Sequence, residues 1–189
     1  MKRIEIFSPA KINVGLFVVA KRADGFHDIE TVFYPIGLRD KMSFDPADEF
    51  SFACDDPTIP TGADNLVVKA KDALERETGK RCDVAVRLEK RIPTGGGLGG
   101  GSSNAATTLV SLNELCGLGA SRETVARLAL ELGSDVPFFL RPVPSFATGR
   151  GEKLDPLDFR IPFPILVVNP KIHVSTAEAY GACVPKKAS

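Results

Sequence analysis

The sequence predicts an α+β domain, and three observations favour this class. The first third of the chain alternates apolar and polar residues at the two-residue period of β-strands. Two helix patterns follow one another after residue 100, with no strand pattern between them. The chain has 189 residues, of which 43% are hydrophobic and 25% charged, and this size is enough to bury a core without disulfide or metal cross-links.

The predicted strands of the first third begin at residue 4. Ile4 and Ile6 alternate with charged residues before Ser8-Pro9, and a second alternation follows at residues 12–18. Asp24-Gly25 is a turn signal. Further strands are predicted at residues 31–36, 41–44 and 50–53, the last two separated by the acidic segment 45–49.

The helices are predicted from capping residues and apolar periodicity. Asp64 or Asn65 caps a helix whose apolar face lies within residues 66–74, and Gly79 ends it. A strand is predicted at residues 84–88. Ser102 or Ser103 caps a second helix, which ends at about Leu115. A third helix is predicted at residues 125–132, between Ser121 and Gly133.

The proline-rich remainder of the chain contains three further predicted elements. Strands are expected at residues 145–148 and 165–168, and a helix is expected from about Val174 to Tyr180.

Charge and cysteine content exclude several classes of protein. The 24 basic residues balance the 24 acidic ones, so the chain lacks the broad positive field of a general nucleic-acid binder. The four cysteines lie far apart without a C-x-x-C pair, which argues against a zinc site or a disulfide framework. No signal-peptide pattern precedes Lys11, and we therefore expect a reducing, cytoplasmic compartment. The longest uncharged apolar stretch, residues 12–20, is shorter than the roughly 20 residues that span a bilayer, so no membrane segment is predicted.

A glycine-rich loop is the strongest functional signal. Six glycines lie within residues 95–101, between a predicted strand and a predicted helix. Without Cβ atoms, their amides can approach an anion closely, and the following helix N-terminus adds unpaired N–H donors. A flexible linker is the alternative, but linkers rarely lie between a strand and a capped helix of one domain. The predicted phosphate-binding segment is Pro93-Thr94-Gly95-Gly96-Gly97-Leu98-Gly99-Gly100-Gly101-Ser102-Ser103.

The common nucleotide-binding motifs do not account for this loop. Gly95, Gly97 and Gly100 satisfy G-x-G-x-x-G, but a second helix follows where a dinucleotide fold needs a strand ending in an acidic residue. No G-K-[ST] sequence is present, as a P-loop requires, and the protein-kinase signatures H-R-D and D-F-G are also missing. A different nucleotide fold is therefore expected.

Two further segments carry polar residues with two possible roles each. Lys11 and Asn13 share one face of the opening strand beside Gly15, either as solvent-facing edge residues or as ligand-binding groups. Asp135 is either the N-cap of a short helix or a carboxylate that acts as a general base. The local sequence leaves both alternatives open.

Four ordered segments together resemble one family. Pro9-Ala10-Lys11-Ile12-Asn13-Val14-Gly15-Leu16 and the loop that starts at Pro93 resemble the first two motifs of the GHMP kinases, which include galactokinase, homoserine kinase and mevalonate kinase. Arg22-Ala23-Asp24-Gly25-Phe26-His27 and Leu132-Gly133-Ser134-Asp135-Val136-Pro137-Phe138 narrow the resemblance to the members that phosphorylate 4-diphosphocytidyl-2-C-methyl-D-erythritol in isoprenoid biosynthesis. The resemblance extends over essentially the whole chain.

The resemblance implies ATP-dependent phosphorylation of the C2 hydroxyl of that small-molecule substrate. By this resemblance Asp135 takes the hydroxyl proton, Lys11 orients Asp135 and neutralises charge, and residues 93–103 hold the ATP phosphates, with Mg²⁺ bridging phosphate oxygens and no protein ligand assigned to it. The implied substrate-binding residues are Asn13, Phe26, His27, Thr176 and Tyr180. The alternatives are a GHMP kinase with another small substrate and a non-catalytic nucleotide-binding module.

The resemblance also implies the fold and its division. We expect a ribosomal protein S5 domain 2-like fold, with an ATP-binding N-terminal domain at residues 1–160 and the start of a second domain at residues 161–189. The third family motif, a Gly-Thr-Gly-Ala-like sequence in the C-terminal domain, does not occur. The chain is thus expected to correspond to an N-terminal portion whose C-terminal domain is largely absent. No oligomeric state is predicted.

Overall fold

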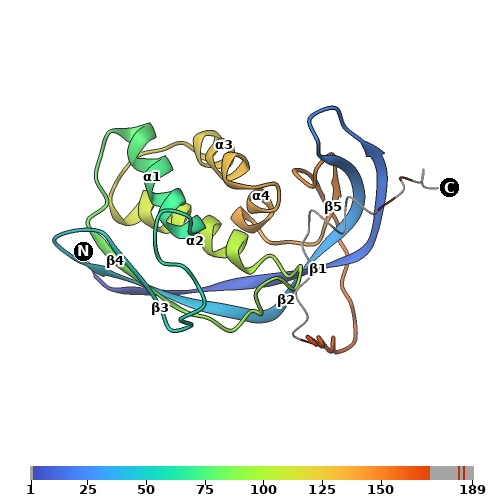
Figure 1. The fold of residues 1–189 in the computed structure, drawn as a ribbon, viewed down its shortest axis with the longest axis horizontal. Coiled ribbons are helices and arrows are strands. Elements are labelled where there is room, and N and C mark those ends of the chain that lie inside the picture. Colours follow the sequence, from blue (N-terminus) through green and yellow to red (C-terminus); the bar gives the residue numbers. More distant parts are fainter. Residues whose placement is uncertain (1, 171–182, 184, 186–189) are drawn as a thin grey trace.

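A computed structural model describes residues 2–170, 183 and 185 of the chain. In this part of the chain, helices lie on one face of a twisted sheet of six strands (Figure 1). The elements are β1 (Ile4–Lys21), β2 (His27–Pro46), β3 (Ser51–Cys54), α1 (Leu66–Thr78), β4 (Val84–Glu89), α2 (Gly100–Leu115), α3 (Arg122–Leu132), α4 (Val136–Leu140), β5 (Ser145–Thr148) and β6 (Lys153–Pro156).

The long strand β2 organises the sheet. Along one edge it pairs with β1 in an antiparallel hairpin. Along the other edge, Lys41–Pro46 pairs with β4 and Thr31–Phe33 pairs with β5, both antiparallel.

Two predicted interruptions of the strands are wrong. Ser8-Pro9 lies inside β1, and residues 37–40 lie inside β2. Pro9 is accommodated because β1 is an edge strand, where a missing N–H costs no ladder bond on the outer side, and the register shifts between Pro9 and Ala10. The same pairing extends the hairpin to His27, which brings its tip beside β5 (Figure 1).

The three helices predicted before residue 135 are confirmed, but α2 begins earlier than expected. Asn65 and Ser121 cap α1 and α3 through their side chains, as the sequence predicted. The N-cap of α2 is Gly99, in the left-handed region at φ 71°, and no side chain caps this helix. Capping by Ser102 or Ser103 is therefore wrong, because the glycines can adopt the entry geometry themselves and both serines fall within the first turn.

The last third of the chain departs from the sequence prediction in two places. Strand β5 lies at residues 145–148 as predicted, and it continues through a turn with Gly149 and Gly151 into β6, which was not predicted. The strand predicted at 165–168 is wrong: no ladder of the described residues includes this segment. Val167 packs instead against the small apolar cluster around Ala10, Ile92 and Leu98. The helix predicted from Val174 to Tyr180 lies outside the described residues.

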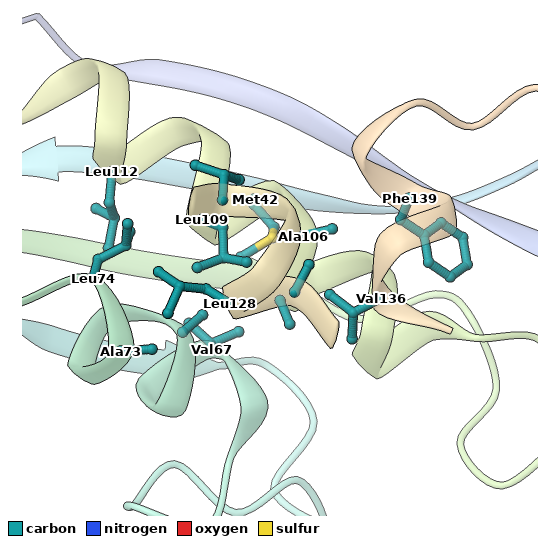
Figure 2. Close-up of a cluster of buried hydrophobic side chains, with 14 of the residues drawn as sticks. Met42, Val67, Ala73, Leu74, Ala106, Leu109, Leu112, Leu128, Val136 and Phe139 are labelled. Atoms are coloured by element: carbon teal, nitrogen blue, oxygen red, sulfur yellow. The ribbon is translucent and has the colours of Figure 1, made fainter. Parts of the chain in front are cut away.

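The main core fills the space between the helices and the sheet (Figure 2). Met42 and Phe44 of β2 are fully buried against Leu109 and Leu112 of α2 and Leu74 of α1. Each such side chain contributes roughly 1.5–3 kcal/mol when it leaves water. Because α2 is buried along much of its length, its N-terminal turn has a fixed position over β1 and β2.

All four cysteines are free thiols, and burial raises the pKa of Cys82 to about 12, so this thiol remains protonated. Within the described residues, no helix combines the length and the apolar character that crossing a membrane requires.

Candidate active site

A cavity of about 760 Å³ opens between the β1–β2 hairpin, the glycine loop and the segment before α4. It brings together seven residues that the sequence analysis had singled out in four separate segments: Lys11, Asn13, Phe26, His27, Gly97, Ser102 and Asp135. The other residues that line the cavity are Leu16, Lys21, Gly25, Ile29, Phe33, Ser134 and Arg150.

Lys11 is a buried cation at the centre of this cavity wall. The residue is only 5% exposed, so the alternative of a solvent-facing edge lysine is wrong. Its ammonium lies 3.4 Å from the Asp135 carboxylate and donates to Asn13 Oδ1 at 2.7 Å. The ammonium also lies 4.6 Å from the centroid of the Phe33 ring. These three contacts together restrict the Lys11 ammonium to one position in the cavity wall.

Asp135 occupies the N-cap position of α4 without acting as a cap. Its side chain forms no capping hydrogen bond with the helix. The carboxylate instead faces Lys11, and its side chain is 34% exposed. Of the two alternatives for Asp135, the structure therefore contradicts capping and leaves an accessible carboxylate beside a buried ammonium.

Asn13 is oriented by its neighbours on the hairpin. Its Oδ1 accepts from Lys11, and its Nδ2 donates to the Thr31 hydroxyl at 3.0 Å. Thr31 in turn donates to the carbonyl of Gly15. This chain of hydrogen bonds fixes which end of the Asn13 amide faces the ammonium, since only the oxygen can accept.

The glycine loop is joined to β1 directly next to Lys11. The backbone N–H of Lys11 donates to the Leu98 carbonyl at 2.9 Å, while the Leu98 side chain packs against Ala10 and Ile92. Gly95, Gly97 and Gly99 all have φ near +70°, a conformation that L side chains rarely adopt. A Cβ at Gly97 would meet no atom within 4 Å, so open space lies over the amides at this point.

A buried ion pair anchors the entry to this loop. Asp40 of β2 is fully buried, and its carboxylate accepts from Lys90 Nζ at 2.8 Å and from the amides of Arg91 and Ile92 at 2.7 and 2.8 Å. Asn104 of α2 donates to the same carboxylate at 3.1 Å. The carboxylate of Asp40 thus connects β2, the segment that leads into the glycine loop, and α2.

Phe26 and His27 are presented by the turn at the tip of the hairpin. Asp24 accepts from Arg22 Nε and from the Phe26 amide, and Arg22 also pairs with Asp28 at 3.0 Å. Hydrogen bonding to Arg22 is the main reason why the pKa of Asp24 lies below its ordinary value. The Phe26 ring is 46% exposed and lies at the cavity wall.

The structure adds residues that the sequence analysis missed and leaves two predicted ones undescribed. Thr176 and Tyr180 lie outside the described residues. Arg150 and Lys21 line the cavity, although they lie outside the four motifs, and Ser134 lines it from within the motif at residues 132–138, where it had no assigned role. Arg150 lies in the tight turn between β5 and β6. The Gly-Arg-Gly sequence at residues 149–151 is the signal for this turn, but it indicates a hairpin only when β6 is also predicted.

Comparison with known proteins identifies the family. Residues 65–141 match the model of the GHMP kinases N terminal domain. The chain is 44% identical over 187 residues to the 4-diphosphocytidyl-2-C-methyl-D-erythritol kinase of Chlorobium limicola, covering 98% of this chain and 65% of that protein. The enzyme of the same name from Salinibacter ruber is 42% identical over 188 residues, covering 96% of this chain and 66% of that protein. The chain belongs to the GHMP kinase family. It spans about two thirds of the length of these relatives and corresponds to their N-terminal portion.

Solved structures of other kinases have the same fold as this chain. A crystal structure of 4-(cytidine 5'-diphospho)-2C-methyl-D-erythritol kinase has a TM-score of 0.70 at 37% identity, covering 84% of this chain and 61% of that one. The homoserine kinase of Cytophaga hutchinsonii, at 19% identity and a TM-score of 0.65, covers 100% of this chain and 62% of that one and shares the fold. The predicted α+β fold of a GHMP kinase N-terminal domain is confirmed.

Two glycines of this GHMP kinase loop differ in what a methyl group would meet. At Gly99 a Cβ would lie 2.6 Å from Phe139 Cζ and 3.3 Å from Lys11 Cγ, whereas at Gly97 it would meet nothing. We expect Gly99→Ala to lower the free energy of unfolding by about 3 kcal/mol, from left-handed strain plus overpacking, and Gly97→Ala by only about 1 kcal/mol. Urea unfolding followed by circular dichroism measures both. Equal losses for the two variants would show that Phe139 and Lys11 move aside at no cost.

Proposed function

We propose that this domain belongs to a kinase that transfers the γ-phosphoryl group of ATP to the C2 hydroxyl of 4-diphosphocytidyl-2-C-methyl-D-erythritol, in isoprenoid precursor biosynthesis. The observation that carries the proposal is the Lys11–Asp135 pair, held at 3.4 Å in one cavity beside the glycine loop. Both the names of the relatives at 42–46% identity and the four motifs favour this substrate.

The paired residues suit proton removal from an alcohol. The accessible Asp135 carboxylate accepts the hydroxyl proton as the oxygen attacks phosphorus. The buried Lys11 ammonium holds that carboxylate in place and neutralises negative charge at the reacting centre. Asn13, fixed by Lys11 and Thr31, keeps its place at the wall where the substrate polyol binds. In-line phosphoryl transfer needs such positioning more than it needs covalent chemistry.

The residues of the glycine loop fit the phosphates of ATP. The amides around Gly97 lie under open space, the N-terminus of α2 has no side-chain cap, and the Ser103 hydroxyl is buried with no hydrogen-bond partner among the described residues. These are the donors that a phosphate chain uses. Residues 93–103 would hold the triphosphate, and Mg²⁺ bound to phosphate oxygens would supply charge neutralisation.

The cytidine end of the substrate is assigned to the hairpin tip. The exposed Phe26 ring offers a stacking face, which is worth roughly 1–3 kcal/mol for a nucleobase. His27 lines the same wall. Thr176 and Tyr180, which lie outside the described residues, are also assigned to substrate binding in this proposal. Residues 1–160 form the ATP-binding domain in this proposal, residues 161–189 begin the next domain, and the kinase acts in the cytoplasm.

A substrate panel tests the proposal on the natural full-length chain. With ATP and Mg²⁺, we expect phosphorylation of 4-diphosphocytidyl-2-C-methyl-D-erythritol and none of mevalonate or homoserine. Product is identified by ³¹P NMR, which also reports the position of the new phosphate. Turnover of only the other two alcohols would reject the substrate, and nucleotide binding without any product would favour a non-catalytic module.

A further inference from the structure

A buried hydroxyl on β2 belongs to the hydrogen-bond chain that leads to the proposed catalytic pair. Thr31 is only 3% exposed, and within the described part of the chain it is not among the residues that line the cavity. Its hydroxyl accepts from Asn13 Nδ2 at 3.0 Å and donates to the Gly15 carbonyl. Any effect of Thr31 on a bound substrate must therefore pass through Asn13.

A β-bulge makes the Gly15 carbonyl available to this hydroxyl. The pairing of β1 with β2 shifts register between Val14 and Leu16, so Gly15 has no partner residue on β2. Thr31 lies opposite Leu16, directly beside the bulge. Gly15 has a φ of 71°, the left-handed conformation that glycine adopts at such bulges. The backbone of β1 thus presents a fixed acceptor to Thr31.

This acceptor sets the direction of the hydrogen bonds that follow. A carbonyl only accepts, so the Thr31 hydroxyl donates to Gly15 and offers a lone pair to Asn13. The Asn13 amide is then held at both ends, through Nδ2 by Thr31 and through Oδ1 by Lys11. Without the hydroxyl, Nδ2 would lose its acceptor, and the amide would be held only by the end of a lysine side chain.

The Lys11 ammonium depends on the anchored amide for its place beside Asp135. Its nitrogen lies 2.7 Å from Asn13 Oδ1 but 3.4 Å from the Asp135 carboxylate, so the amide makes the shorter contact. Resting on the function proposed above, we infer that Thr31 is a positioning residue of the kinase, which holds Asn13, and through it the Lys11 ammonium, in the geometry that phosphoryl transfer requires. A displaced charge at the reacting centre lowers turnover, while ATP binding at the glycine loop is unaffected.

Thr31→Val in the natural full-length chain tests the inference, because valine keeps the shape of threonine and removes both hydrogen bonds. We expect the turnover number with the diphosphocytidyl substrate to fall by about tenfold, as the loss of a buried hydrogen bond predicts, with the Michaelis constant for ATP nearly unchanged. Thr31→Ser keeps the hydroxyl and should restore most of the turnover. The matched control is Thr108→Val on α2, where a buried threonine also donates to a backbone carbonyl, at 2.8 Å, and turnover should stay unchanged.

Hydrogen exchange of the Asn13 side-chain amide, followed by ¹⁵N NMR, measures the positioning without turnover. Asn13→Ala assigns the signals by removing them. We expect the Nδ2 protons to exchange with solvent about tenfold faster in Thr31→Val than in the unmodified chain, because their acceptor is gone. Thr31→Ser should retain the slow exchange.

Three results would overturn the inference. Full turnover in a folded Thr31→Val variant would show that the hydroxyl has no part in the reaction. Equal losses in Thr31→Val and Thr31→Ser would assign the effect to packing, and an equal loss in Thr108→Val would assign it to general destabilisation. Failure of the proposed function looks different, since the unmodified chain would form no product from the diphosphocytidyl substrate while the Asn13 amide would still exchange faster in Thr31→Val.

Discussion

Replacing Asp135 by Asn should lower the turnover number of the full-length kinase by about a thousandfold, because the amide cannot accept the hydroxyl proton. The affinity for ATP should stay nearly unchanged, since the amides of the glycine loop are untouched by the substitution. Steady-state kinetics with the diphosphocytidyl substrate separates the two quantities. The structure supports this expectation because the carboxylate lies at the cavity wall, 3.4 Å from the Lys11 ammonium, and makes no capping bond to α4.

The control for this prediction is Asp155→Asn, an exposed carboxylate on β6. It should leave turnover at the level of the unmodified chain. Thermal unfolding of both variants detects any loss of folded protein, which matters because Asp135→Asn leaves the buried Lys11 without its counter-ion. Unchanged turnover of a folded Asp135→Asn variant would exclude this carboxylate as the general base.

The second large effect is expected at Asp40, on stability rather than on chemistry. Asp40→Asn removes the charge that neutralises Lys90, whose side chain is only 7% exposed. Breaking one side of a buried ion pair leaves an uncompensated charge, and we expect the free energy of unfolding to fall by about 4 kcal/mol. Urea unfolding measures the loss. The Michaelis constant for ATP should rise as well, because Asp40 holds the amides of Arg91 and Ile92 at the entry to the glycine loop.

A double variant distinguishes charge from packing at this site. Asp40→Asn combined with Lys90→Met removes both charges, so the double variant should be more stable than Asp40→Asn alone. The exposed pair of Arg81 and Asp83 provides the matched control, and Asp83→Asn should change stability little. If Asp40→Asn and Asp83→Asn cost the same, the buried carboxylate does not anchor the loop.

The two residues of the proposed catalytic pair were only partly predictable from the sequence. The resemblance of Pro9–Leu16 and of Leu132–Phe138 to family motifs singled out Lys11 and Asp135. The local pattern alone was also compatible with a solvent-facing lysine and with an N-cap aspartate. The structure decided between them, through the burial of Lys11 and the missing capping bond of Asp135. Arg150 could not be found from a local pattern, because its place in the cavity depends on contacts with Phe26 and Ser134. Both residues lie far from Arg150 along the chain.

The sequence by itself determined the glycine loop, the helix caps at Asn65 and Ser121 and the order of the elements from β3 to α3. These features depend on dihedral preferences and on hydrogen bonds over a few residues, which are local properties of the chain. Only the tertiary structure decided which charges leave water. The local pattern around Lys11 also fits a solvent-facing edge, and nothing in the sequence around Asp40 or Lys90 marks them as buried. They are buried because β2 carries partners along both edges and α2 packs over β1 and β2. Burial and ion pairing between distant segments depend on how the sheet and helices pack, and a local pattern contains no information on that packing.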